Sequence, residues 1–180
     1  MTQTFDASTR TEAPVRADEV TALRGFLDYH RDTFRMKCAG LTQQQLAEAH
    51  PPSAMTLGGM MKHLALNEVG WFGYTLGGAP YPPLFDGVDW QSDPDWEWRT
   101  ATEDDPLELR VIYDDSVRRA DGAIDEALAR GGLDAESVGQ SSSDGAFSLR
   151  WILLHMLEEY ARHNGHADLL RESIDGETGE

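Results

Sequence analysis

The chain has 180 residues, with 32 acidic and 15 basic side chains and a formal net charge of −17 at pH 7. A surface this negative repels phosphate backbones and anionic lipid headgroups, so we expect neither a nucleic acid nor a membrane as a partner. The length suits a single domain. The one cysteine, Cys38, excludes an intramolecular disulfide, and the first residues lack the apolar segment of a signal peptide. We therefore expect a cytoplasmic protein.

The N-terminal part of the chain predicts a flexible arm followed by a helix. Residues 1–15 are polar and have no period, whereas apolar side chains recur at steps of three and four from Arg16 to Gly40. That spacing indicates a helix with one buried face. A short helical turn follows, where Thr42 and Gln45 have the spacing of a capping box before the Pro–Pro stop.

A second long helix is predicted after Thr56, an N-cap residue, and it ends at the glycine pair 77–78. Its apolar face carries His63 and Asn67 among methionine, leucine and tryptophan side chains. Residues 79–105 then form a proline-rich stretch without a period that holds three of the five tryptophans. Loops of this length inside a domain are uncommon and are usually functional or disordered, and the tryptophans favour a packed flap.

Two more long helices complete the predicted fold. Pro106 suits the first position of a helix over 106–130, and Ser148 suits the N-cap of a helix from Leu149 to about Ser173. The segment between them is polar, and we expect a connector there and no strand anywhere in the chain. Four such helices predict an all-α four-helix bundle, with a single domain over 16–175.

The last helix has polar side chains where its buried face should be apolar. In "LEEYARHNGHADLLRE", residues 157–172, Glu159 and His163 lie four apart and therefore on one face. Burying an unpaired carboxylate there would cost several kcal/mol of desolvation free energy. A divalent metal would compensate it, and His63 on the second long helix supplies a third ligand. Two imidazoles and one carboxylate form the kind of open site that catalytic zinc enzymes use.

Simpler readings of these residues stay open at this stage. Glu159 also fits a buried salt bridge, with Arg162 or with an arginine of another helix, and the sequence alone does not choose between that and a metal. His30 fits a core histidine whose hydrogen bonds are satisfied. Glu-x-x-x-His is a common spacing, so the argument depends on His63 arriving from a second helix.

Two stretches of the chain carry a resemblance to a known family. "SAMTLGGMMKHLALNEVGWF" and, further along, "SLRWILLHMLEEYARHNGHADLLRESIDG" resemble the DinB-like superfamily, and more narrowly its actinobacterial domain-of-unknown-function branch. The resemblance covers most of residues 17–175. Members are four-helix bundles, often dimers, with a metal held by a histidine on the second long helix and by two residues on the fourth.

The resemblance implies a ligand set and a chemistry. Many relatives have His-x-x-x-His on the fourth long helix, whereas this chain has Glu159 in the first of those two positions and His163 in the second. The change is similar to the mycothiol-dependent maleylpyruvate isomerases, whose ligands are His, Glu and His. The resemblance thus supports a metal at His63, Glu159 and His163, and it implies a homodimer and the thiol-dependent chemistry of superfamily S-transferases and isomerases.

Our first hypothesis from the sequence is a metal-dependent S-transferase or isomerase that joins a low-molecular-weight thiol, such as mycothiol, to a small electrophile. Zn²⁺ is our first choice of metal, while Ni²⁺ and Fe²⁺ also accept two imidazoles and a carboxylate. A metal-assisted hydrolase is an alternative within enzymes. A non-catalytic metal-binding or dimeric interaction module is the alternative outside them.

Four further side chains are candidates for catalytic or supporting roles. His30 is a candidate general base or thiol-binding residue, and Asn67 is a candidate hydrogen-bond donor to a ligand. His155 and His166 are candidates for orienting ligands or relaying protons.

Overall fold

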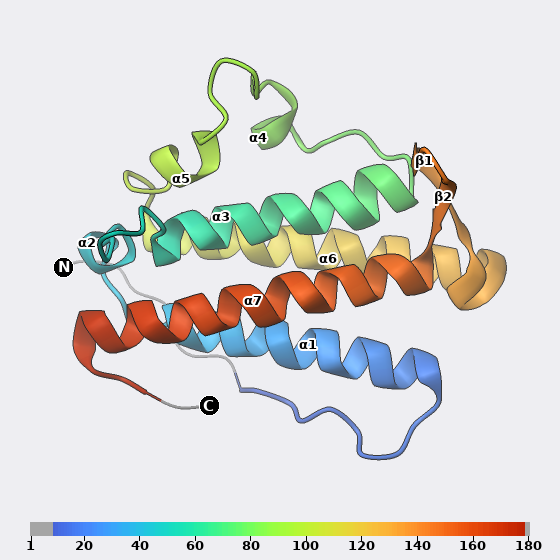
Figure 1. Ribbon diagram of the computed structural model, residues 1–180, viewed down its shortest axis with the longest axis horizontal. Helices are drawn as coiled ribbons and strands as arrows, with labels where there is room; N and C mark the ends of the chain where they lie inside the picture. The colour runs from blue at the N-terminus through green and yellow to red at the C-terminus, as the bar shows by residue number, and fades with distance from the viewer. Residues whose placement is uncertain (1–8, 179–180) are drawn as a thin grey trace.

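A computed structural model describes residues 9–178 and shows a mostly helical chain, as predicted (Figure 1). Four long helical segments lie side by side, with their axes roughly parallel or antiparallel to one another. They are α1 (Glu19–Cys38), α3 (Leu57–Glu68) with its continuation η1 (Val69–Leu76), α6 (Pro106–Gly131) and α7 (Leu149–Asp175). The predicted ends of these segments differ from the observed ends by a few residues at most.

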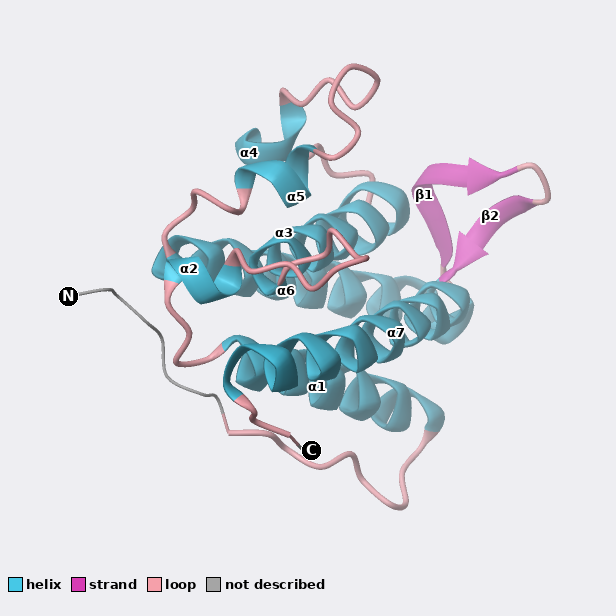
Figure 2. Cartoon of the chain, turned by 60° about the vertical axis from the view of Figure 1, so that its left-hand side comes forward, coloured by secondary structure: helices cyan, strands magenta, loops and turns pink. Residues whose placement is uncertain are grey.

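The core lies between these segments, which pack mainly as two pairs. Helix α1 packs along α7, and α3 packs along α6 (Figure 2). Buried leucine, methionine, phenylalanine and tyrosine side chains from all four helices form one hydrophobic cluster. Helices α3 and α7 run in opposite directions on the same side of the molecule, so the first half of α3 lies beside the second half of α7 (Figure 1).

The helix caps follow the sequence signals. Thr42 and Gln45 form the predicted capping box of the short helix α2 (Gln43–Leu46). The Thr56 side chain accepts a hydrogen bond from the backbone N–H of Gly59, and Ser148 accepts one from Trp151. These bonds satisfy backbone donors that a helix N-terminus leaves without a partner within the helix.

The end of the α3 segment is wound as a π-helix, which the apolar pattern did not predict. The helical hydrogen-bond pattern changes after Glu68, and η1 continues through eight residues to Leu76. A π-helical stretch widens the helix locally and is found most often near functional sites. Trp71 lies on this stretch and packs against Trp151 and His155 of α7.

The tryptophan-rich segment 79–105 contains two short helices that the sequence did not predict. They are α4 (Pro83–Asp86) and α5 (Trp96–Thr100). Helix α5 packs against α3, so at least this part is a packed flap. Its length of five residues explains why no periodicity was visible in the sequence.

The prediction that the chain has no strand is wrong. Residues Glu136–Ser142 (β1) and Gly145–Ser148 (β2) pair as an antiparallel hairpin before α7, after the 3₁₀ turn η2 (Gly132–Asp134). Nearly all of its side chains are exposed or half-exposed, so no alternation of apolar and polar residues marks the strands. Backbone pairing and packing against η1 hold the hairpin instead.

The described part of the predicted N-terminal arm lies along α1. The Arg10 guanidinium lies 4.5 Å from the centre of the Tyr29 ring, and Pro14 lies over Gly25 so closely that an added Cβ would meet its Cδ at 2.6 Å. Residues 1–8 of the predicted arm lie outside the described part. Between residues 9 and 178, no helix is both long and apolar enough to cross a bilayer.

Candidate metal centre

Three side chains from α3 and α7 meet where the two helices face each other. His63, Glu159 and His163 each offer one ligand atom, and these atoms lie within 4.8 Å of one another. The His63 and His163 ring centres are 5.0 Å apart, and Glu159 Oε2 lies 3.5 Å from His163 Nε2. The structure therefore brings together the three residues that the sequence predicted as metal ligands.

The His63 ring is held on both sides by polar groups. Its Nδ1 lies 3.2 Å from Glu97 Oε1, and its Nε2 lies 3.2 Å from the Asn67 amide nitrogen. An amide nitrogen can only donate, so Nε2 accepts and Nδ1–H donates to Glu97. A carboxylate on one imidazole nitrogen orients metal-binding histidines in proteins and leaves the lone pair on the other nitrogen. In His63 that lone pair is on Nε2, where a metal would take the place of the Asn67 hydrogen bond.

Glu97 reaches His63 because α5 lies very close to α3. A Cβ on Gly59 would meet the Trp98 ring at 2.5 Å and the Trp98 Cα at 3.3 Å, so glycine permits this approach. Trp98 then stacks on the His63 ring at a centroid distance of 5.1 Å, and the neighbouring Glu97 becomes buried. The tryptophan-rich segment thereby supplies one wall of the site.

His163 is buried in an environment that keeps it neutral. Burial, followed by the nearby imidazoles of His63 and His166 and the Arg162 cation, lowers the pKa of His163 to about 4. Its Nδ1 is also buried and has no hydrogen-bond partner among the described residues. A neutral imidazole with an unbonded nitrogen is the form that binds a metal ion.

Arg162 does not take the role that the salt-bridge reading gave it. Its guanidinium bonds Glu158 at 2.8 Å on the exposed side of α7. A fully buried salt bridge lies elsewhere, between Arg31 and Glu68. Glu159 instead faces His163, which favours the metal reading of the pair.

The other candidate residues lie at different distances from this cluster. Asn67 contacts His63, as described, and the His166 ring lies 5.7 Å from the His163 ring with a buried Nδ1 that has no partner in the described chain. His155 packs against Trp71, at 4.5 Å between ring centres, and stacks on Trp151.

His30 lies on α1, away from the three clustered side chains. The Asn164 amide lies 3.3 Å from its Nδ1 and also donates to its backbone oxygen at 3.0 Å. Burial lowers the pKa of His30. This environment resembles the core histidine of the simpler reading, and the general-base role of His30 stays a prediction.

Sequence reasoning missed Glu97 and Trp98. Both lie in a segment without periodicity. Glu97 reaches the site by contacting His63, which is 34 positions earlier in the chain, and Trp98 stacks on the same ring. The only local signal was the gathering of tryptophans in segment 79–105. That signal indicated a packed segment without indicating what it packs against.

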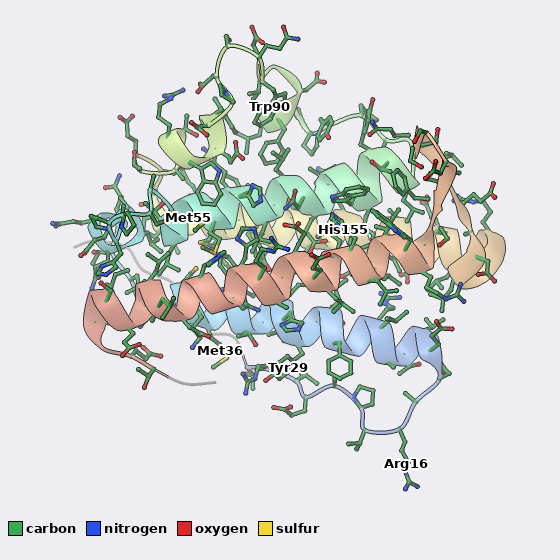
Figure 3. All side chains as sticks on the ribbon, viewed as in Figure 1. Arg16, Tyr29, Met36, Met55, Trp90 and His155 are labelled. Carbon is green, nitrogen blue, oxygen red and sulfur yellow. The ribbon has the colours of Figure 1, made fainter. Side chains whose placement is uncertain are left out.

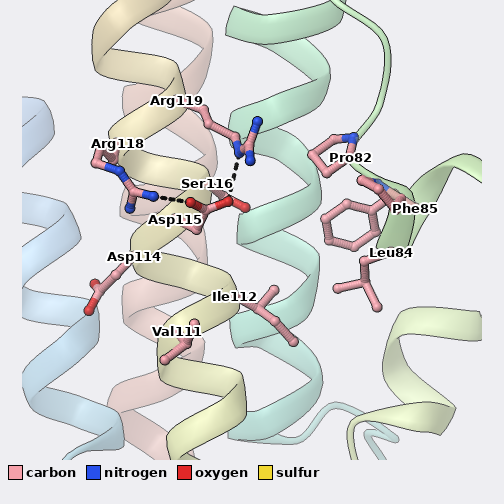
Figure 4. Close-up of a pocket in the computed structure, with 11 residues that line it drawn as sticks. Pro82, Leu84, Phe85, Val111, Ile112, Asp114, Asp115, Ser116, Arg118 and Arg119 are labelled. Atoms are coloured by element: carbon pink, nitrogen blue, oxygen red, sulfur yellow. Dashed lines mark hydrogen bonds and ion pairs between the residues drawn. The ribbon is translucent and has the colours of Figure 1, made fainter.

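A separate groove lies between α4 and α6. Leu84 and Phe85 of α4 face Val111 and Ile112 of α6, and Arg118 and Arg119 both pair with Asp115 beside them (Figure 4). This groove of about 460 Å³ is not lined by any of the three clustered side chains. We therefore place the candidate centre between α3 and α7.

Comparison with known families agrees with this geometry. The family model of mycothiol-S-transferases matches residues 22–176, which is most of the chain. The chain belongs to the mycothiol-S-transferase family. The match extends from α1 to the end of α7 and so includes His63, Glu97, Glu159 and His163. No curated protein matched the chain. The resemblance to DinB-like, mycothiol-related proteins is thereby confirmed.

Proposed function

We propose that this protein is a metal-dependent S-transferase that joins a small electrophile to mycothiol or a similar thiol. The observation that carries the proposal is the convergence of His63, Glu159 and His163 within 4.8 Å in a member of the mycothiol-S-transferase family. Four-helix-bundle architecture, a homodimer and a cytoplasmic location belong to the same proposal.

The residues fit a divalent cation on three independent grounds. Two imidazoles and one carboxylate are a common donor set for zinc. The His163 Nε2 and Glu159 Oε2 atoms face each other at 3.5 Å, which supports a ligand pair from one face of α7. The Glu97 carboxylate on His63 Nδ1 supports the tautomer with its lone pair on Nε2, where a metal would take the place of the Asn67 hydrogen bond. Zn²⁺ is our proposed ion, because its preferred ligands and geometry suit three protein ligands with an open position.

In this proposal each residue has a defined task. His63, Glu159 and His163 would hold the cation, which when bound supplies the positive charge that keeps a thiol ionised near neutral pH. Glu97 holds the His63 ring in place. The Asn67 amide, beside His63 Nε2, is a donor for a ligand that enters the site. His155 and His166 are the candidates for orienting ligands or relaying protons.

The overall reaction is a substitution. The thiolate sulfur forms a bond to the electrophilic carbon, the bond from that carbon to its leaving group breaks, and the leaving group takes the electron pair. The thiol proton passes to solvent. Cys38 is not needed as the nucleophile, because it is buried and burial raises the pKa of its thiol.

The test is turnover of an electrophile by zinc-loaded, untagged protein with and without mycothiol. We expect turnover that requires the thiol and that is lost in Glu159→Gln, while the matched control Glu158→Gln, one residue away on the exposed side, keeps it. Turnover that is independent of thiol would instead support the hydrolase. No turnover, with a melting temperature that falls sharply on chelation, would support the non-catalytic metal-binding module.

A further inference from the structure

A pocket of about 340 Å³ opens next to the candidate metal centre. Three separate parts of the chain meet there: the α3–η1 segment, the tryptophan-rich segment and the β1–β2 hairpin. The side chains that line it include those of Asn67, Trp71, Thr75, Tyr81, Trp90 and Gln140. Trp90 lies on the tryptophan-rich segment, beside α3 (Figure 3). His155 lies on α7, in the half of that helix that begins at the hairpin.

The pocket depends on close backbone approaches that bring the hairpin against η1. A Cβ on Gly139 would lie 1.8 Å from the Tyr74 backbone oxygen and 2.9 Å from the Gly78 Cα, so only glycine fits at this position. This approach places the neighbouring Gln140 in the pocket wall. On the opposite wall, the Tyr81 hydroxyl would lie 3.3 Å from a Cβ on Gly70. The Tyr81 side chain therefore packs directly on η1.

The wall of the pocket is aromatic and uncharged. Trp71, Tyr81 and Trp90 provide ring faces and edges, while the amides of Asn67 and Gln140 and the Thr75 hydroxyl provide hydrogen-bonding groups. Of the residues that the structure describes here, no lining residue carries a charge, although the whole chain has a net charge of −17. Such a wall stacks on flat rings and would strip water from a charged ligand without compensation.

Asn67 links the pocket to the metal centre. Asn67 belongs to the pocket wall and contacts His63 Nε2 at 3.2 Å, so a molecule in the pocket lies one side chain from the cluster. Trp71 belongs to the wall and contacts His155. The pocket thus lies beside the centre with Asn67 between them, and a ligand held there would have to pass its reacting atom beyond that side chain to meet a thiol at the centre.

We propose that this pocket binds the electrophile, and that the electrophile is an uncharged molecule with an aromatic ring. The inference rests on the proposed function and names the substrate class of the same site. For a chlorinated nitroaromatic, the thiolate sulfur bonds to the ring carbon, the C–Cl bond breaks and chloride leaves with its electron pair. The proton of the thiol goes to solvent.

Binding is measured apart from turnover with a compound that cannot react. 1,3-Dinitrobenzene has no leaving group, so equilibrium dialysis against metal-loaded protein gives its affinity directly. The ring-matched anion 3,5-dinitrobenzoate tests the demand for an uncharged ligand. Trp90→Leu and Gln140→Ala probe the wall, and both side chains are exposed enough that substitution leaves the core intact. Phe26→Leu is the control, because Phe26 on α1 is similarly exposed (50% against 37%) and lies outside the pocket lining.

We expect dinitrobenzene to bind, Trp90→Leu to weaken its binding about five-fold through the lost ring contact, and Phe26→Leu to leave its binding unchanged. Dinitrobenzoate should bind at least about ten-fold more weakly, since its carboxylate must lose water beside an uncharged wall. Equal binding of the two compounds, or equal binding by wild type and Trp90→Leu, would overturn the inference. Displacement of dinitrobenzene by mycothiol would also overturn it, because the pocket would then hold the thiol.

The result separates this inference from the proposed function. If dinitrobenzene binds as expected but chlorodinitrobenzene is not converted with mycothiol, the pocket stands and the transferase proposal fails. If conversion of other electrophiles requires mycothiol but dinitrobenzene does not bind, the transferase stands and the pocket assignment fails.

Discussion

Substitution of Glu68 tests whether the buried ion pair holds α1 and α3 together. Arg31 is 1% exposed and Glu68 is fully buried. The Arg31 guanidinium donates two hydrogen bonds to the Glu68 carboxylate, at 2.8 and 2.7 Å. The Tyr160 hydroxyl of α7 donates a third to Glu68, at 2.7 Å. Burial raises the pKa of Tyr160, so this hydroxyl stays a donor at working pH.

The magnitude follows from what Glu68→Gln leaves behind. Removing one partner of a buried pair costs about 3–5 kcal/mol, because the other charge stays buried without compensation. Arg31 would keep Asp28 at 3.0 Å and Asp121 at 2.9 Å, both partly exposed, so we expect the lower end, about 3 kcal/mol. Tyr160→Phe removes one hydrogen bond to a charged group and should cost less, about 1–2 kcal/mol.

Urea unfolding of the metal-free protein measures these losses, and a double-mutant cycle isolates the pair. Arg31→Met and Glu68→Gln should each destabilise by about 3 kcal/mol, and the double variant should lose at least about 2 kcal/mol less than their sum. Losses that simply add would refute the reasoning, because they would mean that the two side chains act independently. A loss under about 1 kcal/mol in Glu68→Gln would refute it as well, since it would mean that Arg31 is not left uncompensated.

Three further predictions follow from single side chains. Glu97→Gln should weaken metal binding about 10- to 100-fold by removing the carboxylate on His63, measured by competition with a chelating dye; an unchanged affinity would contradict this role. Cys38 should resist a thiol-labelling disulfide at pH 8 in the folded protein and react at once in denaturant, because it is buried and burial raises the pKa of its thiol; rapid labelling of the folded protein would contradict it. Because burial lowers the pKa of His30, the unfolded chain binds more protons than the folded chain as pH falls below about 6.5, so stability is lost toward acid and is complete above that pH. The drop in melting temperature from pH 7.5 to 5 should therefore be smaller in His30→Asn than in wild type, and an equal or larger drop would be contrary to this account.

The sequence predicted well the elements that repeat a local pattern. The long helices follow from apolar side chains at steps of three and four, and the caps at Thr56 and Ser148 follow from the residue types that bond free N–H groups. The three clustered residues were predicted because Glu159 and His163 are polar on an otherwise apolar face. Their position opposite His63 then follows from packing α3 against α7 in opposite directions.

Features that depend on contacts between distant segments were not predictable in this way. The β1–β2 hairpin has no apolar alternation, and the close approach of Gly139 to η1 becomes visible only in the folded chain. Glu97 reaches His63 because Gly59 lets α5 approach α3, and nothing in the sequence around Glu97 marks it. The buried salt bridge was expected at Glu159 as an alternative, whereas the fold places it at Glu68, where Arg31 reaches it from another helix.

Metal content tests the central claim most directly. Untagged protein is reconstituted with zinc, dialysed and analysed by plasma mass spectrometry, in wild type, His63→Ala, Glu159→Gln and the control Glu158→Gln. We predict about one metal ion per chain in wild type and control, and almost none in the other two variants. Wild-type protein without metal after reconstitution, or equal metal in all four proteins, would contradict the assignment of His63, Glu159 and His163 as the metal ligands.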